Sequence, residues 1–163
     1  MVEVGEKAPD FTLLNQDREP VQLSEAVKKS PVVLAFFPAA FSRVCTKEMC
    51  TFRDSFEELR SLSATVFGIS VDTFFSLRAW ANEQHLSFPL LSDFNKDVIA
   101  KYDVWNEDLY GMKGVAKRAI FLVDQSGTIR YREVLGDPTR EPDYVQLKEA
   151  LAQLEIKSSG SHR

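Results

Sequence analysis

The feature that most constrains the fold is a continuous run of apolar residues at positions 32–37. A run of this kind is typical of a central strand with both faces covered. A loop is expected at residues 38–44, and the next apolar positions recur at steps of three and four residues, which indicates one face of a helix. These positions are Cys45, Met49, Phe52, Phe56 and Leu59. A buried strand followed by an amphipathic helix favours an α/β fold.

The rest of the chain continues this rhythm of strands and helices. Residues 11–15 and 21–23 predict an N-terminal β-hairpin, and Ser24 stands where the N-cap of a short helix at 25–29 belongs. Further strands are expected at 65–71, 119–124 and 129–134, and further helices at 74–84, 95–102 and 142–154. The pattern predicts an α/β domain with a mixed central β-sheet flanked by helices.

Length and composition favour a single domain. With 163 residues, 44% of them hydrophobic and 27% charged, the chain resembles one ordinary globular unit with a sizeable core. We expect this domain to span residues 1–156 and to be followed by a polar, flexible tail at 157–163. The net charge of −4 comes without a run of basic residues, so nucleic acid is not an expected partner.

The apolar segments are too short to indicate a membrane protein. The longest nearly apolar run, residues 31–41, is about half of the roughly 20 residues that a spanning helix needs. The N-terminal residues lack the basic start and apolar stretch of a secretory signal. We therefore expect a cytoplasmic protein without a membrane partner.

The cysteine count directs attention to redox chemistry. Two cysteines are too few for a disulfide framework, and with two histidines they do not make a plausible structural zinc site. No flavin, haem or nicotinamide motif and no phosphate-binding glycine loop is present, so no cofactor is expected. Neighbouring cysteines in a cytosolic protein are more often catalytic or redox-active than structural.

The reactive candidate is Cys45, which lies where a strand ends and a helix begins. If Ser42 caps this helix, Cys45 falls in the first turn, where unpaired N–H groups and the helix dipole favour an anion such as a thiolate. The thiolate is the nucleophilic form of cysteine. The alternative is that Cys45 is one more small apolar residue of the helix face.

Helix geometry separates Cys45 from Cys50. Five residues turn through about 500°, which leaves the two side chains roughly 140° apart around the helix. Their Cα atoms would be about 8.7 Å apart, beyond the limit of roughly 7 Å for a disulfide. A bond between them requires the start of the helix to unwind.

The order and spacing of Pro38, Ser42 and Cys45 resemble the signature of the peroxiredoxin family. A second cysteine five positions later, Cys50, resembles the bacterioferritin comigratory protein subgroup, also called peroxiredoxin Q. The resemblance extends over nearly the whole chain through the blocks at residues 5–11, 88–93 and 118–124. It implies a thioredoxin-like fold.

The same resemblance implies a role for each motif residue. Cys45 would attack the peroxide and Cys50 would resolve the product, while Pro38 would shield the cysteine from water. Arg118 would lie beside Cys45 and stabilise charge that moves from sulfur to oxygen, together with the Ser42 hydroxyl. Glu48, one helical step from Cys45, would orient the arginine; its alternative is a solvated surface glutamate.

The implied activity is reduction of hydrogen peroxide and organic hydroperoxides to water or alcohols through a Cys45 sulfenic acid and a Cys45–Cys50 disulfide. Thioredoxin or a similar dithiol protein would re-reduce the disulfide, and the enzyme would be a monomer or homodimer. Arg43 and Val44 replace the proline and glycine common in this subgroup and resemble one-cysteine relatives. A one-cysteine peroxidase with Cys50 idle and a non-catalytic redox sensor therefore stay open as alternatives.

A thiol–disulfide oxidoreductase fits less well, because that class normally separates its cysteines by two residues and this chain separates them by four. Among the other conspicuous side chains, Trp80 is expected to pack within a helix face, and Trp105 to pack rather than to line a substrate pocket. His85 is expected at a surface or a helix end.

Overall fold

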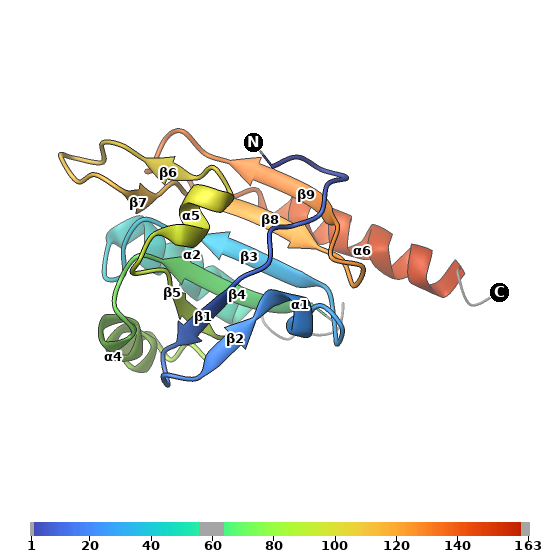
Figure 1. Ribbon diagram of the computed structural model, residues 1–163, viewed down its shortest axis with the longest axis horizontal. Coiled ribbons are helices and arrows are strands. Elements are labelled where there is room, and N and C mark those ends of the chain that lie inside the picture. The colour runs from blue at the N-terminus through green and yellow to red at the C-terminus, as the bar shows by residue number, and fades with distance from the viewer. Residues whose placement is uncertain (1, 56–63, 161–163) are drawn as a thin grey trace.

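The computed structural model describes residues 2–55 and 64–160. In this part of the chain, seven strands form one sheet in the order β2-β1-β5-β4-β3-β8-β9, which Figure 1 shows face on. The strands are β1 (Thr12–Asn15), β2 (Pro20–Gln22), β3 (Val32–Phe36), β4 (Thr65–Ser70), β5 (Leu90–Ser92), β8 (Ala119–Val123) and β9 (Ile129–Val134). Pairing of β3 with β4 and of β4 with β5 is parallel, and the other pairings are antiparallel. The predicted mixed sheet and N-terminal hairpin are confirmed.

Strand β3 occupies the middle of the sheet, as its apolar run predicts. All five of its residues are buried. Its side chains alternate between two cores: Val32, Leu34 and Phe36 belong to one cluster, whereas Val33 and Ala35 belong to the other. The run is uniformly apolar because both faces of this strand are covered.

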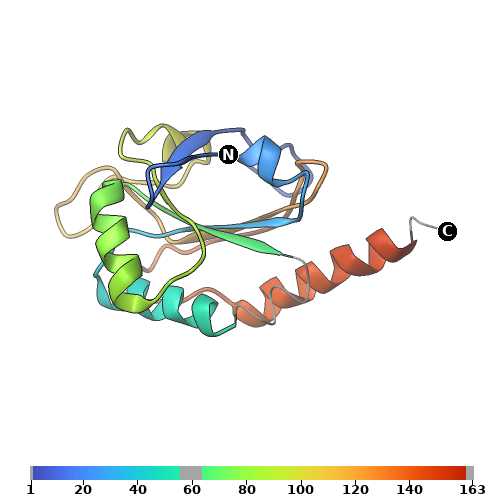
Figure 2. The same ribbon diagram turned by 90° about the horizontal axis from the view of Figure 1, so that it is seen from below.

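The helices cover the two faces unequally. Figure 2 shows α2 (Arg43–Asp54), α4 (Phe74–Gln84) and α6 (Tyr144–Gly160) on one side of the sheet. The short helices α1 (Leu23–Ala26) and α5 (Asp97–Lys101) lie on the other side with the N-terminal segment. None of the helices in residues 2–55 and 64–160 combines the length and the apolar character that crossing a bilayer needs.

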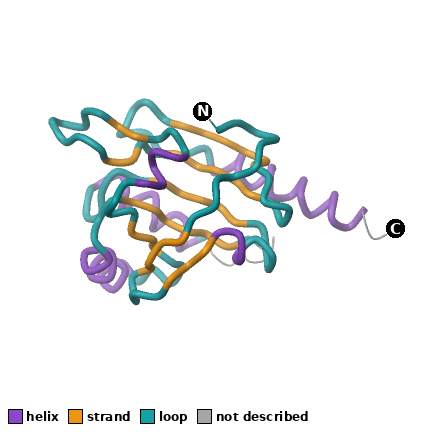
Figure 3. The backbone as a smooth tube through the Cα atoms, viewed as in Figure 1, coloured by secondary structure: helices purple, strands orange, loops and turns teal. Residues whose placement is uncertain are grey.

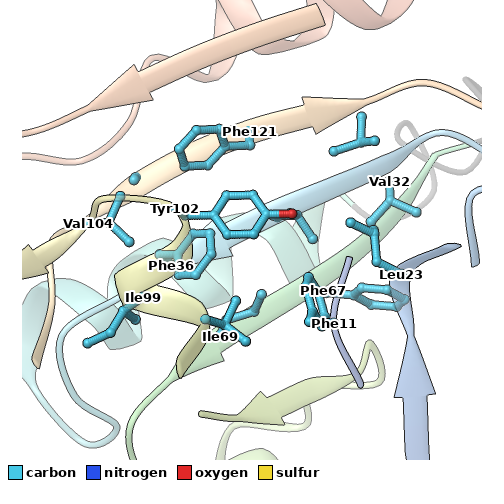
Figure 4. Close-up of a cluster of buried hydrophobic side chains, with 14 of the residues drawn as sticks. Phe11, Leu23, Val32, Phe36, Phe67, Ile69, Ile99, Tyr102, Val104 and Phe121 are labelled. Atoms are coloured by element: carbon cyan, nitrogen blue, oxygen red, sulfur yellow. The ribbon is translucent and has the colours of Figure 1, made fainter. Parts of the chain in front are cut away.

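The core on the side of α1 and α5 is rich in aromatic rings, several of which Figure 4 shows. The rings of Phe36, Tyr102 and Phe121 contact one another, with centroids 5.2–5.8 Å apart. The Tyr102 hydroxyl donates a hydrogen bond of 2.6 Å to the carbonyl of Pro9. These rings lie in a different cluster from Cys45, so many of the phenylalanines fill the core and do not take part in the site.

Several predicted boundaries need correction. Helix α1 begins at Leu23, with Gln22 at the N-cap. Ser24 lies inside that helix, and its amide and hydroxyl both donate to the Asp10 carboxylate. Helix α6 extends to Gly160, past the predicted end at residue 154, so residues 157–160 of the expected tail are helical. The predicted helix positions Phe56 and Leu59 lie outside the described residues.

Three short strands were not expected from the sequence. They are β5, β6 (Trp105–Asn106) and β7 (Val115–Ala116). Strands of two or three residues are too short to show a periodicity of their own. Figure 3 shows β6 and β7 within a loop-rich excursion between α5 and β8.

Candidate active site

Cys45 lies in the first turn of α2, the helix that follows the central strand. Strand β3 ends at Phe36, a loop follows, and Ser42 takes the N-cap position with extended backbone angles. Cys45 is the third residue of the helix and is only 1% exposed. Its free thiol is therefore enclosed by the core while it stays at the helix start, as the sequence predicted.

Arg118 is brought to Cys45 by the register of the sheet. Phe36 of β3 pairs with Ala119 of β8, so the residue before Ala119 lies beside the loop that follows β3. The guanidinium Nη2 of Arg118 donates to Cys45 Sγ at 3.3 Å, and the same nitrogen donates to the carbonyl of Pro138 at 3.1 Å. A fixed cation thus faces the sulfur.

Glu48 holds the other side of the guanidinium. Its Oε1 accepts a hydrogen bond of 2.7 Å from Arg118 Nη1, and both side chains are at most 2% exposed. The position of Glu48, one turn after Cys45, allows a single helix face to supply both the thiol and the carboxylate. The alternative of a solvated surface glutamate is wrong, because Glu48 is fully buried.

Burial also sets the ionisation of this pair. Burial raises the pKa of Glu48 to about 7, although the Arg118 guanidinium favours the charged carboxylate. For Arg118, burial lowers the pKa, but Glu48 and Cys45 more than offset this, so its pKa is raised and it stays a cation. The site therefore holds a permanent positive charge beside the sulfur and a carboxyl group that titrates near neutral pH.

Ser42 and Pro38 are placed near Cys45, with one difference from the prediction. Ser42 is the N-cap residue, but its side chain makes no cap hydrogen bond, and its hydroxyl donates to the carbonyl of Ala39 at 2.7 Å. Pro38 is buried. Both residues line the cavity next to Cys45, so each lies within the candidate site.

The cavity at Cys45 has a volume of about 250 Å³ and a mainly apolar lining. The loop that joins β6 to β7 forms part of the cavity wall, through Leu109, Tyr110 and Met112. Tyr110 and Met112 are large apolar residues that remain 82% and 46% exposed. Sequence reasoning missed these three residues because they lie more than 60 positions from Cys45 and belong to no recognisable motif.

Cys50 lies on another side of α2, as helix geometry predicted. It is half-buried, and its thiol donates to Gln84 Oε1 at 3.4 Å. A separate cavity of about 630 Å³ lies next to it. The two cavities share three wall residues, Arg43, Val44 and Thr139, so the first residues of α2 separate the two thiols.

The remaining conspicuous residues take no direct part in the site. Trp80 is fully buried, and Trp105 packs against the aromatic cluster and is not among the residues that line the Cys45 cavity. His85 is exposed at the C-cap of α4. Within the described residues, no group of three or more His, Cys, Asp or Glu side chains could hold a metal ion.

Fold and site together define a class of protein: an α/β domain whose buried thiol, at a helix start, is contacted by a fixed guanidinium. Comparison with known families agrees, because the model of the AhpC/TSA family matches residues 4–132. The chain belongs to the AhpC/TSA family, whose members include the peroxiredoxins. It is a thiol-dependent peroxidase with the thioredoxin-like fold predicted above.

Individual relatives support this assignment. Alkyl hydroperoxide reductase E of Mycobacterium tuberculosis is 37% identical over 156 residues, which cover 94% of this chain and 99% of the relative. A chloroplastic 2-cysteine peroxiredoxin of Chattonella marina var. antiqua is 39% identical over 143 residues, or 82% of this chain and 71% of that protein.

Solved structures agree as well. Peroxidoxin BcpB of Mycobacterium tuberculosis superposes with a TM-score of 0.82 at 31% identity, over 96% of this chain and 98% of that one. This likeness supports the predicted resemblance to the bacterioferritin comigratory protein subgroup. The reduced 2-Cys peroxiredoxin of Plasmodium vivax has a TM-score of 0.86 at 22% identity, over 98% of this chain and 85% of that one, which shows the shared fold.

Proposed function

We propose that Cys45 is the peroxidatic nucleophile and that the enzyme reduces hydrogen peroxide and organic hydroperoxides. The observation that carries this proposal is the 3.3 Å contact between Arg118 Nη2 and Cys45 Sγ in a buried site. A guanidinium at this position stabilises the thiolate before reaction and the negative oxygen that develops during it. The Cys50 thiol instead donates to the Gln84 amide oxygen, and the nearby Arg53 guanidinium donates its hydrogen bonds to Asp54 and to the carbonyl of Gln84.

The first step is a displacement at oxygen. The Cys45 thiolate attacks the terminal oxygen of the hydroperoxide, an S–O bond forms and the O–O bond breaks. The leaving alkoxide or hydroxide takes up a proton and departs as alcohol or water, and Cys45 becomes a sulfenic acid. Arg118 donates hydrogen bonds along the path of the moving charge, while Pro38 helps to keep bulk water away from the sulfur.

The cavity supports organic hydroperoxides as substrates beside hydrogen peroxide. Its volume of about 250 Å³ is much larger than hydrogen peroxide needs, since one water occupies about 30 Å³ in the liquid. Its apolar wall includes Leu109 and Met112, which suit a hydrocarbon substituent. The peroxide group would lie toward Cys45 and Arg118, and the substituent toward the exposed excursion.

The second step joins the two cysteines. The Cys50 thiol condenses with the Cys45 sulfenic acid, a disulfide forms and water is released. Arg43 and Val44 stand between the two cavities, so the first turn of α2 opens for the sulfur atoms to meet. This opening is a local unfolding event, and its free energy limits how fast the disulfide forms.

The third step restores both thiols. Thioredoxin or a similar dithiol protein donates two electrons and two protons through a mixed disulfide. The proposal also includes a cytoplasmic location, where the reducing environment keeps thiols available, and a monomer or homodimer as the active form.

A one-cysteine peroxidase is the second candidate, and the position of Cys50 favours it. The Cys50 thiol is engaged with Gln84 and lies in a cavity of its own. In that case an external thiol would attack the Cys45 sulfenic acid directly. The two candidates share the first step and differ in the second.

One experiment separates these possibilities. The reduced protein is mixed rapidly with one equivalent of hydrogen peroxide, quenched with a thiol-blocking reagent and analysed by peptide mass spectrometry. We expect both thiols to disappear as a Cys45–Cys50 disulfide within seconds. Oxidation of Cys45 alone would support the one-cysteine candidate. If neither cysteine reacts faster than free cysteine, the peroxidase mechanism is wrong and a redox-sensing role becomes the better explanation.

A further inference from the structure

The indole of Trp80 connects the hydrophobic core to the helix turn that carries Cys45. Trp80 lies on α4, is 0% exposed, and its ring packs against Phe37 and Phe41 with centroids 5.2 and 6.3 Å away. A tryptophan side chain has a single hydrogen-bond donor, the indole N–H. In this structure the indole N–H donates to Thr46 Oγ1 at 3.2 Å. The partner of a core side chain therefore lies in the first turn of α2.

Thr46 is in turn hydrogen-bonded to Ser42, the N-cap residue of α2. Its hydroxyl donates to the carbonyl of Ser42 at 2.7 Å, and its amide donates to the same oxygen at 2.9 Å. The hydrogen bonds from Trp80 to Thr46 and from Thr46 to Ser42 form what we call the Trp80 chain. The Trp80 chain spans residues 42–46, the turn that contains Cys45.

A second contact holds the loop in front of this turn. The Asp72 carboxylate accepts hydrogen bonds from the amide of Ala40 at 2.8 Å and from the hydroxyl of Ser70 at 2.7 Å. Ser70 is fully buried at the end of β4, so this carboxylate is anchored to the sheet. The next residue of the loop, Phe41, has a φ of 67°, which is unfavourable for a phenylalanine. A strained loop is thus held closed by a few identifiable hydrogen bonds.

We infer that Trp80, Thr46 and Asp72 are positioning residues that set how often the Cys45 turn opens. This inference rests on the proposed function, because opening is the step that lets Cys50 reach Cys45. Opening separates Thr46 from Ser42 and leaves the buried Trp80 N–H without its partner, which disfavours the open form. The three side chains act on Cys45 only through the backbone of the loop and turn.

The frequency of opening determines the division of the Cys45 sulfenic acid between two products, the disulfide and the sulfinic acid. In the open form it condenses with the Cys50 thiol and releases water. In the closed form it stays in the cavity, where a second hydroperoxide converts it to the sulfinic acid and leaves as alcohol or water. The Trp80 chain therefore sets the peroxide concentration at which the enzyme inactivates itself.

The first test is Trp80→Phe, which keeps an aromatic ring and removes the N–H. The open form of this variant leaves no indole donor unpaired, so we expect disulfide formation to become about three- to tenfold faster. The peroxide concentration that converts half of Cys45 to sulfinic acid should rise by a similar factor. Both quantities are measured by rapid quenching and peptide mass spectrometry over a series of peroxide concentrations.

Variants of Thr46 provide an independent test of the same chain. Thr46→Val removes the hydroxyl at nearly constant volume and should shift the division in the same direction as Trp80→Phe. Thr46→Ser restores a hydroxyl and should return the division to that of the unchanged protein. In the double variant with Trp80→Phe, Thr46→Val should have a smaller effect than it has alone, because the bond that the two residues share is already lost and only the Thr46–Ser42 bond remains to be removed. Asp72→Asn, which weakens the contact to Ala40, should shift the division independently.

The matched control is Tyr102→Phe. This change also removes one hydrogen bond from a buried aromatic ring, but in the cluster on the opposite face of the sheet. It should lower the free energy of unfolding without altering the division between disulfide and sulfinic acid. A general loss of stability is thereby distinguished from an effect on the Cys45 turn.

Failure of the inference and failure of the proposed function give different results. The positioning role is wrong if Trp80→Phe and Thr46→Val give the same ratio of disulfide to sulfinic acid as Tyr102→Phe. The proposed catalytic cycle would stand in that case. If the unchanged protein forms no Cys45–Cys50 disulfide, the resolving step is wrong. Hydrogen exchange of the amides of residues 43–47 then tests the positioning role directly, because unchanged exchange in Trp80→Phe contradicts it and faster exchange supports it.

Discussion

The two cysteines share one helix, yet their surroundings differ in almost every property. Cys45 is buried beside a cation, in a cavity of about 250 Å³. Cys50 is half-buried beside a neutral amide, in a cavity of about 630 Å³. The first site combines burial with a fixed guanidinium, and both bear on a negative charge at the sulfur. The second has a larger adjoining cavity, as the proposed reaction of Cys50 with other sulfur atoms requires.

This difference teaches that reactivity in α2 is assigned by neighbours from distant segments and not by the helix itself. Of the two sulfur atoms, Arg118, which directly precedes β8, contacts that of Cys45. Gln84, at the end of α4, contacts the sulfur of Cys50. Substitutions that remove a cysteine or one of these neighbours therefore test the comparison directly.

The largest expected effect comes from removing each thiol in turn. Cys45→Ser should abolish peroxide consumption to the background of the buffer. Cys50→Ser should keep the first reaction with peroxide within about twofold and lose turnover with a dithiol donor, because the disulfide no longer forms. Stopped-flow consumption of peroxide measures the first reaction, and a coupled thioredoxin assay measures turnover. Equal loss of the first reaction in both variants would contradict the comparison.

Removing the guanidinium should have the next largest effect. Arg118→Gln should slow the reaction of Cys45 with hydrogen peroxide by about 10²- to 10³-fold, the range for loss of one preorganised donor in an active site. The matched control is Arg53→Gln, on the Cys50 side, where Arg53 donates to the carbonyl of Gln84 at 2.6 Å. This control should keep the rate. Similar slowing in both variants would show that the location of the positive charge does not matter.

Titration of Glu48, on the buried side of α2, should make the free energy of unfolding depend on pH. Its pKa of about 7 in the folded protein lies above the ordinary value of 4.5, so the folded state binds this proton more tightly. The resulting stabilisation is fully present below pH 4.5 and is lost as the pH rises through about 7. Its total size is about 3 kcal/mol, from the difference between pKa values of 4.5 and about 7.

Urea unfolding between pH 4.5 and 8 measures this contribution. We expect the unchanged protein to lose stability with rising pH relative to Glu48→Gln, which cannot ionise. Glu25→Gln, at an exposed helix position, is the control and should follow the unchanged protein. Parallel pH curves for the unchanged protein and Glu48→Gln would rule out this titration.

The smallest effect is expected at the rim of the Cys45 cavity. Met112→Ala removes part of its apolar wall and should lower kcat/KM for cumene hydroperoxide about three- to tenfold, while kcat/KM for hydrogen peroxide changes little. Phe75→Ala is the control, because this residue is exposed and lines a different cavity. An equal loss for both peroxides would assign Met112 a general structural role.

Much of the fold could be predicted because its signals are local. The apolar run of β3 and the spacing along α2 and α4 depend only on neighbouring residues. The errors lie where a distant residue competes with a local one. Asp10 binds Ser24 and removes it from the expected N-cap, and β5 forms only because β1 and β4 pair with it.

The candidate site divides in the same way. Pro38, Ser42, Cys45 and Cys50 lie close together in the sequence, and their pattern was recognisable there. The Ser42 hydroxyl lines the Cys45 cavity and donates to the carbonyl of Ala39, and its expected role in the reaction stays a prediction. Leu109, Tyr110 and Met112 could not be found, because no local pattern relates them to a cysteine more than 60 residues away.

The sequence by itself determined an α/β domain, a thiol at a helix start and a second thiol on another side of the same helix. These follow from periodicity and helix geometry, which act over a few residues. The family resemblance implied that Arg118 and Glu48 lie beside Cys45, and the tertiary structure supplied the contacts that join them. Only the tertiary structure decided that Glu48 is fully buried and that the Trp80 indole donates to Thr46. Such contacts depend on the register of the sheet and on helix packing, which bring together side chains from remote positions.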